Sequence, residues 1–156
     1  MRYSLNQIQS MMLALIPTDY KTEIAEDMDL VELGCIEMAA ALGKELFFET
    51  ESTEKTVDGE TVIIETKYVS EDLTISEAYL ASYFAYRDYL LRLKDELNRD
   101  AINFKTLTFE IKSLEKRPEA INDTLYQVNR YLNNYINQAK GSTAILGKTK
   151  KFGAKR

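Results

Sequence analysis

Apolar side chains recur every three or four positions in four segments of this chain, and each segment is predicted to be a helix. The first begins at Ser4, a residue type that caps helices well, and must end before Pro17. The second spans residues 29–47, and Gly34 within it would permit another helix to approach closely. The buried stripe expected for this second helix consists of Leu30, Leu33, Ile36, Ala40 and Leu46.

The third and fourth helices are the longest. Thr74-Ile75-Ser76-Glu77 has the spacing of a capping box and begins a helix that runs to about Asn98. Pro118 suits the first turn of the last helix, which is expected to end near Lys140 with Gly141 as its stop. The length of the connection between these helices favours an antiparallel pair in one core. The residues expected in their shared seam are Leu90, Leu93, Leu97, Ile121, Leu125, Val128, Leu132, Tyr135 and Ala139.

Two segments follow a different pattern. Residues 48–69 alternate between apolar and polar positions around Asp58-Gly59, a dipeptide typical of tight hairpin turns, and predict a polar hairpin that projects. Residues 104–114 also alternate and favour extended structure. The expected fold is therefore mainly α: a small helical bundle with a projecting β-hairpin, a short extended insert and a C-terminal arm.

Charge divides the chain into an acidic body, residues 1–140, and a basic arm, residues 141–156. The chain has 20 basic and 25 acidic residues, and five of the bases, but none of the acids, lie in the arm. The body forms one helical domain with the hairpin near residues 48–69. Its apolar stretches are too short to span a bilayer, so no membrane span is expected. The single cysteine, Cys35, lies among apolar helix residues and is interpreted as a core thiol in a reducing compartment.

The arm is the first candidate binding segment. It contains too few large apolar residues to offset its ordering entropy, so we expect it to be disordered in an isolated monomer and ordered in an assembly. Its partner would be acidic, either the body of a neighbouring copy or nucleic acid, on which Phe152 would be available for stacking. The candidate partner-binding residues are Lys148, Lys150, Lys151, Phe152, Lys155 and Arg156.

The long third helix is the second candidate. It carries Tyr79, Tyr83, Phe84, Tyr86 and Tyr89, which cover more than one helical face. Some of these rings must pack in the core. Others would be available to a partner, because tyrosine supplies a large contact area at low entropic cost. Tyr79, Tyr83 and Tyr86 are the candidates for this role.

No catalytic motif is present in the sequence. The chain has no histidine and one cysteine, which argues against nucleophilic triads and against zinc sites built from thiolates or imidazoles. A dense acidic group could in principle bind Mg²⁺ or Ca²⁺, but its spacing matches no EF-hand loop, and a solvated surface is the preferred interpretation. The acidic charge also argues against the body binding nucleic acid. The residues of this group are Asp19, Glu23, Glu26, Asp27, Asp29 and Glu32.

The order of these elements resembles that of the small head-to-tail connector (neck adaptor) proteins of tailed bacteriophages. The resemblance includes an Asn103-Phe104-Lys105-Thr106-Leu107-Thr108-Phe109-Glu110-Ile111 segment that leads into a C-terminal helix. It implies a structural subunit with no enzymatic activity and no cofactor. In that family the subunits form a ring, often twelve-fold, that contacts portal and tail proteins while DNA passes through its channel without sequence-specific binding. The unusually acidic hairpin departs from this pattern.

The expected location is thus the virion neck, assembled in the host cytoplasm. The alternative from a different class is a small acidic interaction or regulatory protein, encoded by a phage, that binds a host partner and is absent from virions. A metal-dependent enzyme that uses the acidic group is a third interpretation, and it would require a bound divalent cation and turnover.

Overall fold

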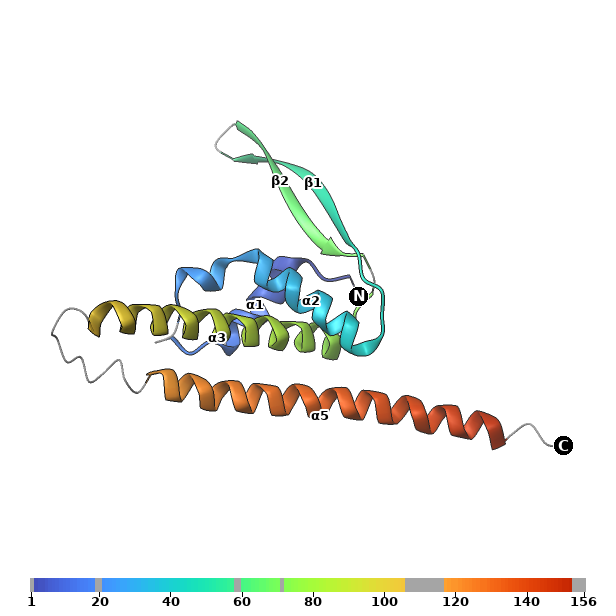
Figure 1. The fold of residues 1–156 in the computed structure, drawn as a ribbon. Helices are drawn as coiled ribbons and strands as arrows, with labels where there is room; N and C mark the ends of the chain where they lie inside the picture. Colours follow the sequence, from blue (N-terminus) through green and yellow to red (C-terminus); the bar gives the residue numbers. More distant parts are fainter. Residues whose placement is uncertain (1, 19–20, 58–59, 71, 106–116, 153–156) are drawn as a thin grey trace.

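The structure of this chain is a computed structural model, and it describes residues 2–18, 21–57, 60–70, 72–105 and 117–152, with side chains for most of them. It is mainly helical with one projecting hairpin, as the sequence predicts (Figure 1). Its elements, in chain order, are α1 (Leu5–Leu15), the 3-10 turn η2 (Glu23–Glu26), α2 (Met28–Leu42), β1 (Phe48–Val57), β2 (Glu60–Val69), α3 (Ile75–Lys105) and α5 (Arg117–Phe152).

The two predicted N-terminal caps are confirmed. The Gln7 backbone N–H donates to the Ser4 hydroxyl at 3.3 Å, and the Ser4 N–H donates to the Gln7 side chain at 2.9 Å. At α3, the Glu77 N–H donates to the Thr74 hydroxyl at 3.2 Å and the Thr74 N–H donates to the Glu77 carboxylate at 2.9 Å. Each box satisfies two backbone donors that the helix itself leaves free. Helix α1 ends at Leu15, before Pro17, as expected.

Helix α2 differs from its prediction in length and in orientation. Gly43 adopts a left-handed conformation with φ 68° and ends the helix, so α2 stops at Leu42 and not near Phe47. The predicted stripe is also wrong in large part, because Leu33 and Ile36 are exposed by 39% and 50%, Ala40 is exposed as well, and Leu46 lies beyond the end of the helix. The residues that α2 buries are Leu30, Val31, Gly34, Cys35, Met38 and Ala39.

The buried face of α2 packs on α3 at a glycine. A Cβ atom added at Gly34 would lie 2.6 Å from the Ala81 carbonyl oxygen and 2.7 Å from the Ala85 nitrogen. Both are backbone atoms of α3, so the two helices touch along their main chains. The close approach expected at Gly34 is therefore confirmed. An ion pair of 2.6 Å from Arg87 to Glu37 ties the same two helices together at the edge of this contact.

Helix α5 runs antiparallel to α3 along the side of α3 that faces away from the hairpin (Figure 1). The predicted seam is confirmed: six of its residues are buried, and Leu97, Tyr135 and Ala139 are half-buried. The buried ones are Leu90, Leu93, Ile121, Leu125, Val128 and Leu132. A second core layer, with Met12, Leu30, Leu80 and Tyr89 among its fully buried members, lies where α1, α2 and α3 meet.

The hairpin pairs Phe48 with Val69 at its base and Val57 with Glu60 near its tip, in antiparallel register. Its base is attached to the body, since Val69 is fully buried and its N–H donates to the Tyr3 carbonyl at 3.0 Å. From there the two strands extend away from the helices (Figure 1). The predicted projecting hairpin is confirmed, while its Asp58-Gly59 turn lies outside the described residues.

Two expectations for the second half of the chain are corrected. Residues 103–105, which the sequence assigns to an extended insert, form the last turn of α3. Gly141 does not stop the last helix, because α5 continues to Phe152. A glycine ends a helix only where the chain turns into a left-handed conformation, as at Gly43, and the only described glycine with a positive φ is Gly43. The rest of the extended insert, residues 106–114, lies outside the described residues.

Candidate interaction surfaces

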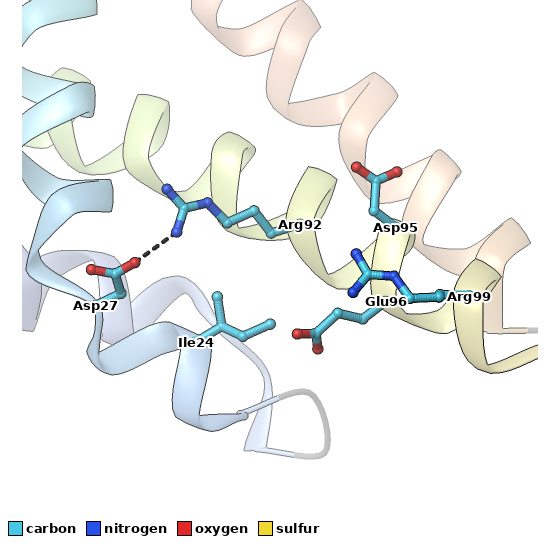
Figure 2. A pocket seen from close by; sticks show the side chains of 6 residues that line it. All are labelled: Ile24, Asp27, Arg92, Asp95, Glu96 and Arg99. Carbon is cyan, nitrogen blue, oxygen red and sulfur yellow. Dashed lines mark hydrogen bonds and ion pairs between the residues drawn. The ribbon is translucent and has the colours of Figure 1, made fainter.

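A charged hollow of about 330 Å³ lies between η2 and the second half of α3 (Figure 2). Arg92 reaches from α3 to Asp27, with 2.6 Å between its guanidinium nitrogen and the carboxylate oxygen. Asp27 also accepts the Asp29 N–H at 3.0 Å as the cap of α2. Three acids, two arginines and one isoleucine line the hollow. Besides Asp27 and Arg92, the lining residues are Ile24, Asp95, Glu96 and Arg99. Because its charges largely offset one another, this hollow selects no class of charged ligand.

A second hollow, of about 290 Å³, lies where the end of α2 meets the start of α3 and the middle of α5. Its polar centre is the ion pair between Lys44 and Glu77. Burial acts to raise the pKa of Glu77, but hydrogen bonds from Lys44 and Thr74 outweigh it and hold the pKa below its usual value. Glu77 is therefore a structural carboxylate that caps α3 and holds Lys44 beside it.

The described residues offer little for nucleophilic or metal chemistry. Cys35 is fully buried, as expected of a core thiol, and burial together with the nearby Glu32 carboxylate raises its pKa to about 12. A thiol with such a pKa stays protonated at neutral pH and is a poor nucleophile. Among the described residues, no three acidic or cysteine side chains are grouped so that they could hold a metal ion.

The acidic surface expected from the sequence is present where it is described, since Glu23, Glu26 and Asp29 are exposed, while Asp19 lies outside the described residues. Basic residues hold part of this surface in place. Arg2 pairs with Glu49 at 2.6 Å and also with Glu51, at the base of the hairpin. Lys67 of β2 pairs with Glu32 of α2 at 2.6 Å. Arg2 binds one face of the hairpin to the N-terminal segment, and Glu32 binds the other face to α2. The two contacts together fix the direction in which the hairpin projects.

The hairpin exposes three consecutive apolar residues of β2. Val62, Ile63 and Ile64 are exposed by 44%, 64% and 40%. Side chains alternate between the two faces of a strand, so Val62 and Ile64 share one face and Ile63 lies on the other. A two-stranded sheet with apolar side chains on both faces and no covering layer is marginally stable in water. The hairpin is therefore a strong candidate for contact with a partner.

The three candidate tyrosines occupy different environments. Tyr86 is only 5% exposed, which places its ring in the core and removes it from any surface of this fold. Tyr83 is half-buried and stacks on Tyr131 of α5, with ring centroids 4.3 Å apart. Tyr79 is 45% exposed and stays available to a partner. The sequence therefore predicted three contact tyrosines, of which the fold leaves Tyr79 exposed, Tyr83 half-buried and Tyr86 buried.

The basic arm begins as part of α5. Its backbone is helical from Gly141 to Phe152, while the side chains of Lys148, Lys150, Lys151 and Phe152 lie outside the described set. Lys155 and Arg156 lie outside the described residues altogether. The expectation that the arm is disordered in an isolated monomer stays a prediction about the chain in solution.

Comparison with known proteins yields no relative: no family model, curated protein or solved structure matches this chain. In the part of the chain that the structure describes, no helix is both long and apolar enough to cross a membrane. The candidate surfaces thus rest on the geometry of the chain itself. The sequence prediction missed that Leu33 and Ile36 are exposed. The only feature of the sequence that could have indicated their exposure is that α2 has more apolar residues than one buried face can hold.

Proposed function

We propose that this chain is a structural subunit that assembles with copies of itself into a ring in the neck of a tailed phage, between portal and tail. The observation that carries the proposal is the projecting hairpin with its exposed Val62, Ile63 and Ile64. Such a hairpin gains stability when another surface covers it. A neighbouring copy in a ring would supply that surface repeatedly.

The order of elements supports the assignment to a neck protein. A short first helix, an acidic second helix, a hairpin, a long tyrosine-rich helix and a closing helix follow one another as in the connector resemblance. The proposed role requires assembly contacts and no catalytic residue or cofactor. Its partners are other copies, the portal and tail proteins, and its location is the virion neck after assembly in the host cytoplasm.

The acidic body fits a channel through which DNA moves. Carboxylates on the hairpin and α2 would repel phosphates, so DNA would slide past the ring and not adhere to it. This is the behaviour expected of a channel through which DNA passes without sequence-specific binding.

Native mass spectrometry of the nuclease-treated protein tests self-assembly. We expect a discrete multiple of the chain mass. Replacement of Val62 and Ile64 with threonine, which retains β propensity but removes apolar surface from one face of the hairpin, should shift the population to smaller species. Unchanged helical circular dichroism in the variant would show that the body still folds. A parent chain that stays monomeric at all accessible concentrations would contradict the proposal.

A further inference from the structure

Helix α2 exposes two large apolar side chains on the side that faces the hairpin. Glu32 marks this side, because Lys67 of β2 reaches it at 2.6 Å. Ile36 follows Glu32 by one helical turn and therefore lies on the same face, with Leu33 beside it. Both side chains are exposed, although α2 buries another face against α3.

The hairpin adds a third apolar side chain to this side. Ile63 and Glu65 lie on the same strand face as Lys67, because side chains alternate along a strand. The pairing register places Glu54 opposite Ile63. Lys67 pairs with Glu32 of α2, and Val69 on the same strand face is fully buried, so this face turns toward the body at the hairpin base. Ile63 is the most exposed of the three strand residues.

We call the face of α2 that carries Leu33 and Ile36, together with the face of β2 that carries Ile63, the α2–hairpin surface; the two faces meet at the ion pair between Glu32 and Lys67. Its rim is acidic. Asp29 precedes Glu32 by one turn on α2, and Glu54 and Glu65 flank Ile63 on the hairpin. These three carboxylates are exposed and make no ion pair with another described residue. A partner for this surface must combine apolar side chains with positive charge.

The end of α5 has that composition. Gly141 is the last residue of α5 with a described environment, and a Cβ atom there would meet nothing within 4 Å. The helix nevertheless continues through residues 142–152, about 17 Å at 1.5 Å per residue. In Figure 1 this overhang runs out past the domain on the side away from the hairpin. The sequence of the overhang has no acidic residue and includes Ile145, Leu146, Lys148, Lys150 and Lys151.

We propose that the α2–hairpin surface of one copy binds the overhang, residues 142–152, of a second copy. The inference rests on the proposed function, since it names the contact through which copies would join. The two surfaces are different, so the contact is heterologous, and its repetition produces a ring or a filament. Each contact is small, but closure of a ring makes the contacts act together.

Charge reversal tests this pairing. The surface variant changes Asp29, Glu54 and Glu65 to lysine, and the overhang variant changes Lys148, Lys150 and Lys151 to glutamate. Each variant alone should weaken assembly by about tenfold or more in sedimentation velocity experiments, because repulsion replaces attraction. A chain that carries both sets should assemble like the parent. A control with Glu119 and Asp123, exposed at the start of α5, changed to lysine should also assemble like the parent.

The outcomes separate this proposal from the proposed function. If the parent assembles and the combined variant does not recover, the pairing is wrong while self-assembly stands. If only the overhang variant loses assembly, the overhang binds elsewhere, and loss of the parent assembly on nuclease treatment would identify nucleic acid as its partner. If both single variants assemble like the parent, neither surface takes part. If the parent itself never assembles, both proposals fail.

Discussion

Replacing Gly34 with alanine is expected to lower the free energy of unfolding by about 1–3 kcal/mol, the usual cost of overpacking a core. The added methyl group would lie 2.6 Å and 2.7 Å from backbone atoms of Ala81 and Ala85, and 2.9 Å from the Ala85 side chain. Backbone atoms cannot rotate away as the end of a side chain can. Helices α2 and α3 would have to separate, and the contacts on either side of Gly34 would loosen.

The same substitution at Gly141 is the matched control. Gly141 is also helical, but a Cβ atom there would have open space around it. Alanine should therefore stabilise α5 locally by about 0.5–1 kcal/mol through its better helix propensity. Urea titrations of both variants give the comparison. If Gly34→Ala were as stable as the parent, the tight crossing of α2 and α3 would be wrong.

Truncation of Leu132 to alanine is expected to destabilise the fold by about 2–5 kcal/mol, as for other large aliphatic residues in cores. Leu132 is 2% exposed and belongs to the seam between α3 and α5. The substitution removes three side-chain carbons and leaves a cavity that two packed helices cannot close completely. Leu125, which is 7% exposed, should behave similarly.

Tyr126 provides the control on the same helix. Its side chain is 69% exposed, so Tyr126→Ala should change the free energy of unfolding by less than about 0.5 kcal/mol. Denaturant titrations should be run at a concentration at which the protein is monomeric. Near-zero effects at both Leu125 and Leu132 would mean that the α5 seam faces solvent in the monomer and packs only between subunits.

Features set by nearby residues could be predicted from the sequence. The caps at Ser4 and Thr74 depend on side chains three positions apart, and the hairpin depends on strand alternation around a turn dipeptide. The seam of α5 was also predictable, because its apolar residues occupy one face of an otherwise polar helix. In each of these three cases the pattern of residues within one segment is sufficient to predict the local structure.

The orientation of α2 could not be predicted in this way. Its sequence is apolar on nearly all sides, so periodicity alone does not choose a buried face. The choice is made by the main-chain contact at Gly34, which turns Val31 and Met38 inward and leaves Leu33 and Ile36 outside. Gly43 ends the helix through its left-handed conformation, while Gly141 stays within a helix, although both glycines follow a helical segment.

The candidate surfaces also differ in whether local patterns or long-range contacts determine them. That a hairpin projects follows from its local pattern, but the sequence predicts a polar hairpin, and the exposure of Val62, Ile63 and Ile64 departs from that prediction. The α2–hairpin surface depends on the ion pair between Glu32 and Lys67, which are 35 positions apart, and on the rotation of α2. Long-range contacts of this kind decide which exposed residues lie together, and no single segment specifies them.

The central claim is that this chain is a structural part of a virion. The most direct measurement is quantitative mass spectrometry of purified particles from a phage that encodes it, with the portal protein as the internal standard. The account predicts that the chain is present at a fixed copy number per particle, unchanged by nuclease treatment and by further purification. Its absence from intact particles would contradict the account and favour a regulatory protein that acts in the infected cell.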